Sequence, residues 1–156
     1  MSDVALPVVK KLKKKKLTIC VAESVTGGGL GEAITAVPGS SQVFRGGIIA
    51  YSDTSKTKFL GVRKALLTKK SAVSEDVAIE MAQSARLQFS SDFAIATTGV
   101  AGPGKAYGQK AGTVWIAIAS RAEVHTVQLA LTGDRAAIRN ATIVSALATF
   151  ERILSS

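Results

Sequence analysis

The sequence predicts a single three-layer α/β/α domain, in which helices cover both faces of a mixed β-sheet. Three observations predict this class. Short apolar, β-branched runs alternate with segments of helical periodicity, two of these runs end in glycine-rich turns, and the chain of 156 residues is long enough for one hydrophobic core. No internal repeat or linker divides the chain, so we expect one domain over residues 1–156.

The first unit is a helix followed by a strand, a turn and a second helix. Residues 5–15 can form a lysine-rich helix, and the apolar run LTICVA at 17–22 is typical of a buried strand that ends at Glu23. Residues 24–29 then form a glycine-rich turn. The helical pattern LGEAITAV follows this turn and is stopped by Pro38-Gly39.

The middle of the chain adds two strands and two helices. Arg45 to Tyr51 reads as a second strand, and the polar stretch after it is compatible with a helix that stops at Gly61. A further helix is expected from Ser74 to about Gln88, because Ser74 can cap its first turn. Residues 92–97 are the next buried strand, and it leads into a second glycine-rich loop at 98–104.

The last part of the chain predicts an antiparallel strand pair and a closing helix. Residues 112–119 and 123–131 are apolar, alternating runs joined by a short turn. Gly133-Asp134-Arg135 opens the final helix, whose apolar residues recur at helical spacing.

Cysteine and histidine usage limits the chemistry. A single cysteine, Cys20, excludes an intramolecular disulfide framework, and with one histidine the chain has no Cys/His zinc cluster, so we expect neither metal nor cofactor. His125 lies in the alternating stretch EVHTVQLAL and is interpreted as a strand residue. A Ser-His-Asp catalytic triad would need this histidine, which lies far in sequence from the candidate motifs described below.

The N-terminus and the charge distribution bear on location and partners. No apolar run approaches the roughly 20 residues of a membrane span, and the apolar piece precedes the charges, which is the reverse of a secretory signal; we therefore expect a cytoplasmic protein with no membrane partner. Six lysines lie between Lys10 and Lys16, and without them the net charge falls from +9 to +3. We interpret them as a solvated helix face, with non-specific contact to nucleic acid or another polyanion as the alternative.

Three loops at the expected carboxyl ends of strands could carry chemistry. The first offers the hydroxyls of Ser24 and Thr26, although helix capping explains both equally well. The second supplies Tyr51 and Lys56. A lysine of lowered pKa can activate a serine where no histidine is available, but Lys56 could also be an ordinary exposed lysine.

The third loop contains small residues from Thr98 to Gly104. Its N–H groups, or the Thr98 hydroxyl, could hold an oxyanion, and tight turn geometry is the alternative reason for its glycines. Arg135 could bind a phosphate or carboxylate, or could simply be an exposed residue beside a capping Asp134.

Several ordered motifs together resemble the CinA C-terminal domain family from Leu17 onward. They are AESVTGG at 22–28, VPGSSQVFRGGIIAYSDTSK at 37–56, GV at 61–62, AVSEDVA at 72–78, TGVAGP at 98–103, GTVWIA at 112–117 and TGDR at 132–135. The resemblance implies a metal-independent amidohydrolase that converts nicotinamide mononucleotide to nicotinate mononucleotide and ammonia, and a homo-oligomer.

The resemblance also implies roles for particular residues. Ser24 would be the nucleophile, Lys56 its base, and Tyr51 an assisting group. The implied substrate-binding residues are Thr26, Gly27, Gly28, Arg45, Gly46, Thr98, Gly99, Ala101, Gly102 and Arg135, with Arg135 as the candidate for the nucleotide phosphate.

The sequence departs from the family pattern at two places. Val25 stands where the family usually has cysteine, and the loop GKAYGQKA at 104–111 lacks the family's usual acid and proline. The altered loop leaves open an alternative, a non-catalytic nucleotide-binding member of the family. The large amino-terminal domain of many relatives is missing from this sequence, so we expect a stand-alone version.

Overall fold

A computed structural model describes residues 1–156, apart from the side chain of Ser2. It contains one five-stranded sheet in the order β2-β1-β3-β4-β5. The first three strands in this order are parallel, and β4 and β5 form the antiparallel pair that the sequence predicts. The strands are β1 (Ile19–Glu23), β2 (Phe44–Ile49), β3 (Phe93–Gly99), β4 (Thr113–Ala119) and β5 (Val124–Ala130).

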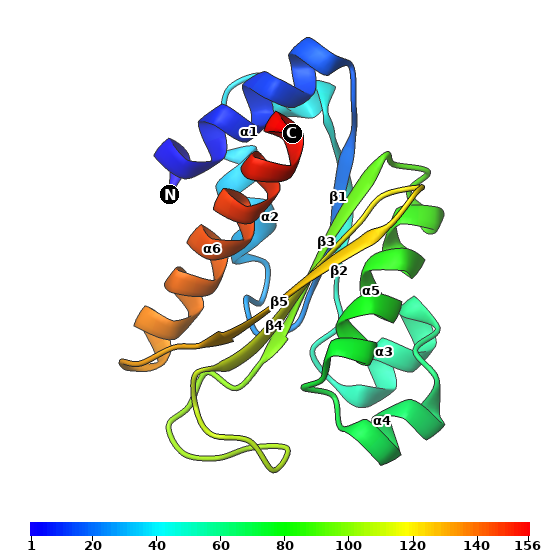
Figure 1. The fold of residues 1–156 in the computed structure, drawn as a ribbon, viewed down its shortest axis with the longest axis vertical. Coiled ribbons are helices and arrows are strands. Elements are labelled where there is room, and N and C mark those ends of the chain that lie inside the picture. The colour runs from blue at the N-terminus through cyan, green and yellow to red at the C-terminus, as the bar shows by residue number, and fades with distance from the viewer.

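Helices cover both faces of this sheet, which confirms the three-layer α/β/α prediction (Figure 1). One layer holds α1 (Ser2–Lys15), α2 (Gly29–Thr35) and α6 (Arg135–Ser155), and the other holds α3 (Asp53–Leu60), α4 (Lys64–Lys70) and α5 (Glu75–Gln88). The short 3-10 helix η1 (Ser40–Gln42) precedes β2. Helix α4 was not predicted, because none of its residues is fully buried and its sequence has no apolar periodicity.

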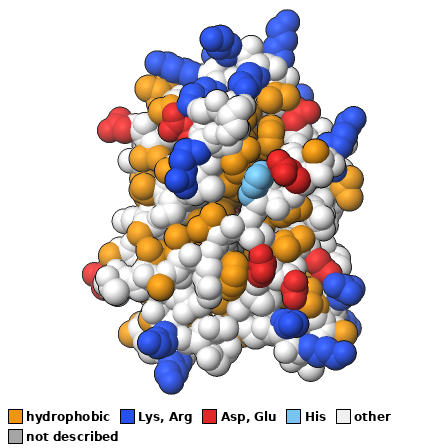
Figure 2. All heavy atoms as spheres, viewed as in Figure 1, with side chains coloured by type: hydrophobic (Ala, Val, Ile, Leu, Met, Phe, Trp, Pro, Cys, Tyr) orange, Lys and Arg blue, Asp and Glu red, His pale blue; other side chains and the backbone are white. Residues whose placement is uncertain are grey.

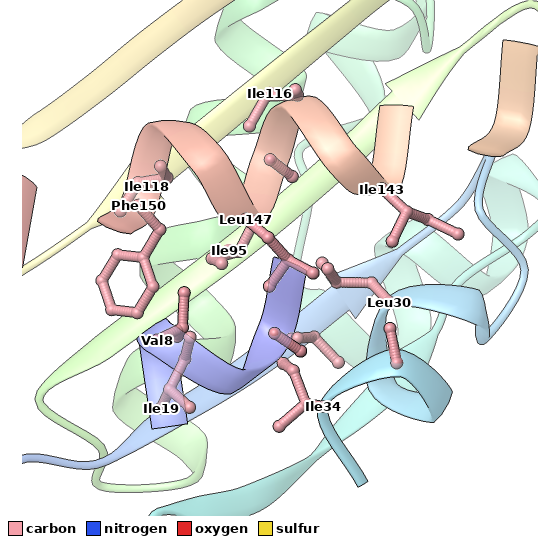
Figure 3. Packing of buried hydrophobic residues seen from close by; sticks show 14 of the residues in the cluster. Val8, Ile19, Leu30, Ile34, Ile95, Ile116, Ile118, Ile143, Leu147 and Phe150 are labelled. Carbon is pink, nitrogen blue, oxygen red and sulfur yellow. The ribbon is translucent and has the colours of Figure 1, made fainter. Parts of the chain in front are cut away.

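The core beneath α1, α2 and α6 consists of large aliphatic side chains. Alternate strand residues such as Ile95, Ile116 and Ile118 point to this face, where they meet Leu147 and Phe150 of α6 (Figure 3). Alternation follows from the two-residue period of a β-strand. Leu30 and Ile34 of α2 lie in the same cluster, so the helix that follows the glycine-rich turn is anchored by the core.

The opposite face of the sheet is lined by small residues. Cys20, Ala22, Ala94, Ala96, Ala117 and Ala119 point to it, and α5 faces them with Ala78, Met81, Ala82 and Ala85. Small side chains on both surfaces allow the helix to lie close to the sheet. Ser74 caps α5 as predicted, since its hydroxyl accepts a hydrogen bond from the Val77 N–H.

Helix α1 begins at Ser2, earlier than predicted, and packs on the core through Ala5, Val8, Val9 and Leu12. Its lysines point outward at the end of the molecule where α1 ends, and basic side chains gather there on the surface (Figure 2). Lys11 pairs with Glu151 of α6 at 2.7 Å. Across the described residues, every helix is too short or too polar to span a membrane.

Candidate active site

A cavity opens at the carboxyl end of the parallel strands, where the loops after β1, β2 and β3 meet. Ligand sites of open α/β sheets occur at this edge. The residues that line the cavity come from these three loops, from the last residue of β3 and from the start of α6. They are Ser24, Val25, Tyr51, Gly99, Val100, Ala101, Gly102, Pro103, Gly104, Ala106, Tyr107 and Arg135.

Ser24 and Lys56 meet at the wall of this cavity. The Lys56 Nζ lies 2.9 Å from the Ser24 Oγ and donates a second hydrogen bond, of 3.0 Å, to the Ala50 carbonyl. Ser24 follows the last residue of β1 and retains a small exposed surface of 7%. Lys56 lies in the first turns of α3 on its inner side, together with Leu60, and is only 1% exposed.

The buried position of Lys56 affects the pKa of its amine. Desolvation lowers the pKa of its amine, and the opposing effect of the Asp53 carboxylate is smaller. No carboxylate pairs with the amine among the residues that the structure describes. A buried lysine with two hydrogen-bond partners and no counter-ion has the properties of a base for the serine hydroxyl.

The turn that carries Ser24 is held by backbone hydrogen bonds. The Ser24 N–H donates to the Thr97 carbonyl at 3.0 Å, and the Ser24 carbonyl accepts from the Gly27 N–H at 3.0 Å. Gly27 and Gly28 have φ values of 57° and 101°, a left-handed conformation that favours glycine. These glycines therefore shape the turn that points the serine side chain toward Lys56.

Glu23 fixes the same turn from its other side. Its carboxylate is buried at the end of β1 and accepts hydrogen bonds from the Leu30 N–H at 2.8 Å and the Gly31 N–H at 3.0 Å. A negative charge at the beginning of α2 is favourable because the first N–H groups of a helix are unpaired and its N-terminus is positive.

Two backbone amides at the cavity could stabilise an oxyanion. The N–H groups of Val25 and Ala101 have no hydrogen-bond acceptor within the described chain, although both residues line the cavity. Amides of this kind stabilise a developing negative charge on a substrate oxygen.

Tyr51 and Arg135 connect the walls of the cavity. The Arg135 guanidinium donates to the Tyr51 hydroxyl at 2.8 Å and to the Gly102 carbonyl at 2.7 Å. The Tyr51 hydroxyl thus faces Arg135, and no hydrogen bond joins it to Ser24 or Lys56 among the described contacts. A proton-relay role for Tyr51 stays a prediction, whereas its place at the cavity is clear.

Several predicted binding residues do not present their side chains to the cavity. The Thr26 hydroxyl is buried against that of Thr97 at 2.7 Å. The Thr98 hydroxyl donates to the Ala72 carbonyl at 2.7 Å, so the expectation that it holds an oxyanion does not fit this structure. Both threonines are buried, and buried hydroxyls normally form hydrogen bonds inside the fold.

Arg45 and Gly46 lie at the wrong end of β2 for this cavity. Gly46 pairs with Cys20, four residues before Ser24, which places it about 13 Å from the active edge. Gly28 is the N-cap residue of α2, and Gly27 lines a neighbouring groove with Arg139. Gly99, Ala101 and Gly102 line the cavity, as their loop position predicts.

Sequence reasoning missed three residues of the site region. Glu23 was treated only as a strand end, although a buried acid directly before a nucleophile is a signal. Arg139 lies one helical turn after Arg135 and donates to the carbonyls of Val25 and Thr26, which the four-residue spacing could have indicated. Tyr107 carried no pattern beyond its aromatic ring in a small-residue loop.

The fold and the site define a class: an α/β domain with a serine and a buried lysine at the carboxyl edge of a mixed sheet. The chain belongs to the CinA family, because the model of the CinA C-terminal domain matches residues 1–154. It is 44% identical over 148 residues to a CinA-like protein of Geobacter sulfurreducens. The matched region covers 94% of this chain and 36% of the relative. A CinA-like protein of Gemmatimonas aurantiaca is 43% identical, and the matched region covers 88% of this chain and 32% of the relative.

Solved structures show the same fold. A CinA superfamily protein from Klebsiella pneumoniae superimposes with a TM-score of 0.96 at 32% identity, covering 99% of this chain and 97% of the other. A competence or damage-inducible protein from Enterobacter asburiae gives a TM-score of 0.95 at 34% identity, with coverage of 98% and 97%. The chain spans about a third of the length of the curated relatives described above.

Proposed function

We propose that this protein is an amidohydrolase that converts nicotinamide mononucleotide to nicotinate mononucleotide and ammonia. The observation that carries the proposal is the 2.9 Å contact between the buried Lys56 Nζ and the Oγ of Ser24, which lines the cavity. The substrate itself is proposed from the family resemblance.

The chemistry follows from the two side chains. Neutral Lys56 accepts the Ser24 hydroxyl proton while the Oγ forms a bond to the carboxamide carbon, and the carbonyl oxygen takes up negative charge. Protonated Lys56 then gives its proton to the departing nitrogen, which leaves as ammonia and forms an ester on Ser24. Water attacks this ester with Lys56 again as the base, releasing the carboxylate and restoring the serine hydroxyl.

The loops supply what the reaction needs around these two residues. The free amides of Val25 and Ala101 would stabilise the oxyanion, and burial lowers the pKa of the Lys56 amine, which favours its neutral, basic form. The cavity volume of about 160 Å³ is smaller than the roughly 300–1,000 Å³ of most small-molecule sites. We therefore place the ring and its amide inside the cavity, with the ribose phosphate at the mouth near Arg135.

Ammonia release from nicotinamide mononucleotide tests the proposal. Ser24→Ala should lower kcat by a factor on the order of 10³ or more, because the nucleophile is lost. Ser41→Ala, a change at an exposed serine, is the matched control and should keep full activity. Undiminished turnover in Ser24→Ala would remove the proposed nucleophile.

A second candidate is a nucleotide-binding protein without turnover, which the altered 104–111 loop favours because Ala106 and Tyr107 line the cavity. The same assay separates the two candidates. Binding of the nucleotide without any product after long incubation would support the second, and measurable hydrolysis would exclude it.

We also propose a homo-oligomer. Strand β2 is an edge of the sheet, and Ile49 at its end is 56% exposed. Light scattering of the purified protein would give the mass, and a monomer at micromolar concentration would contradict this proposal.

A further inference from the structure

Both tyrosines of the sequence line the cavity that contains Ser24. Tyr51 and Tyr107 are the only two in the chain, and their exposed fractions are 55% and 49%. They come from different segments, the loop after β2 and the long connection between β3 and β4, which projects from the sheet (Figure 1). Exposed aromatic rings at a cavity offer π faces to a ligand.

The loop that carries Tyr107 is a closed turn with its own hydrogen bonds. The Ala106 N–H donates to the Gln109 carbonyl at 3.1 Å, and the Gln109 N–H donates to the Ala106 carbonyl at 2.9 Å. The Gln109 side-chain amide also donates to the Val73 carbonyl at 3.4 Å, which ties the loop to the segment before α5. Tyr107 is thus held at the cavity by the loop around it.

Turn geometry does not explain a tyrosine at this position. Tyr107 has a φ of 53° and Gly108 a φ of 71°, and a tight turn with two such residues favours asparagine, aspartate or glycine at both. An unfavourable backbone conformation at a candidate site points to a role for the side chain that occupies it.

The Tyr107 ring itself can attract a positive ligand. Burial, the Asp53 carboxylate and Tyr51 all raise the pKa of the Tyr107 phenol, so the ring is neutral at physiological pH. A neutral phenol ring attracts cations through its face. Arg135, the cationic side chain among the lining residues, is held by Tyr51 and Gly102.

We propose that Tyr107 is a specificity-determining residue that selects a positively charged aromatic ring, with Tyr51 as the second aromatic wall. This inference rests on the proposed function, in which the amide is attached to a pyridinium ring. It adds that the charge of the ring is recognised by a residue of the 104–111 loop.

The test compares a cationic and a neutral probe of the same shape, 1-methylnicotinamide and 3-methylbenzamide. Binding of both is measured by calorimetry on the Ser24→Ala variant, so turnover does not interfere. The variant should bind the cation more tightly, and an added Tyr107→Leu should reduce the cation-to-neutral affinity ratio by about 2- to 30-fold. An added Tyr107→Phe, which keeps the ring, should leave the ratio unchanged.

A cation-to-neutral affinity ratio that is unchanged by Tyr107→Leu would overturn the inference. So would equal binding of the two probes, or binding of neither probe, by the Ser24→Ala variant with Tyr107 intact. Failure of the amidase proposal would look different, because it would abolish ammonia release while leaving the probe ratios as expected. In an active protein, Tyr107→Leu alone should raise KM for nicotinamide mononucleotide by a similar factor and leave kcat within about twofold.

Discussion

The Lys56 amine lies 2.9 Å from the Ser24 hydroxyl, across 32 positions of sequence. The backbone between them completes the arrangement: the Ala50 N–H donates to the Glu23 carbonyl at 2.8 Å, and the Ala50 carbonyl accepts from Lys56 at 3.0 Å. The pairing of β1 with β2 therefore brings the loops of the serine and the lysine together.

Activity should depend on pH through Lys56. Its pKa is lowered by burial, and only the neutral amine can accept the serine proton. We expect kcat/KM to rise about tenfold per pH unit below this pKa and to level off above it, at a pH below the ordinary lysine value of 10.5. A pH–rate profile for ammonia release measures this directly.

The control for the pH profile is Lys56→Arg, because a guanidinium stays charged throughout the range. This variant should be inactive at every pH. A kcat/KM that shows no rise with pH anywhere below 10.5 in the parent would contradict lysine as the base.

Lys56→Met should stabilise the protein at neutral pH while abolishing activity. The unfolded chain binds a proton on Lys56 up to about pH 10.5, whereas the folded chain releases it at a lower pH, so burial of this amine costs stability at neutral pH. We expect a gain of about 0.5–2 kcal/mol, the usual size of a stabilising change. Urea unfolding of both proteins gives the difference.

The pH dependence of the stability difference between Lys56→Met and the parent distinguishes relief of the buried charge from better packing. The parent gains stability as pH rises from the lowered pKa toward 10.5, so the advantage of Lys56→Met should be largest at low pH and shrink toward pH 10. Lys58→Met, at an exposed neighbour, should show no such trend. A stability difference between Lys56→Met and the parent that is constant with pH would argue against a cost of burying the Lys56 charge.

The sequence predicted the layers of the fold, and the structure brings together Ser24 and Lys56, whose catalytic roles stay a prediction. Strands such as LTICVA and FAIAT are buried on both faces and read as continuous apolar runs. Ser24 and Lys56 lie on motifs that the family resemblance marks. Burial of Lys56 could not be read locally, because it depends on how α3 packs against the sheet.

The errors have a common physical origin in strand direction and side-chain orientation. Arg45 belongs to the same motif as Tyr51, but it lies at the start of β2, at the other end of this strand from the cavity. Thr26 and Thr98 are close to the cavity in sequence, yet their hydroxyls turn inward to Thr97 and Ala72. The position of a residue in the sequence predicts which loop it belongs to. It does not predict whether its side chain points into the cavity or into the core.

Cys20 should be unreactive in the folded protein. Its side chain is fully buried in β1, and burial raises the pKa of the thiol to about 11, so almost no thiolate is present at neutral pH. We expect iodoacetamide to label the native protein at least about 100-fold more slowly than protein unfolded in urea. Mass spectrometry of timed samples measures both rates, and equal rates would show that β1 opens readily.

Glu23→Gln should lower kcat more than it raises KM. The carboxylate accepts hydrogen bonds from the N–H groups of Leu30 and Gly31, and an amide would place a donor against one of them. An unsatisfied buried donor costs about 1–3 kcal/mol of stability, and relaxation of α2 would move the turn that holds Ser24.

The matched control for Glu23→Gln is Glu32→Gln, an exposed acid in the first turn of α2. The two changes remove the same charge close to the same helix end, but only Glu23 is buried beside the nucleophile. If both variants lost activity equally, the effect would come from charge alone. A loss confined to Glu23→Gln, with kcat reduced at 10 °C where the fold is intact by circular dichroism, would establish Glu23 as the residue that positions the Ser24 turn.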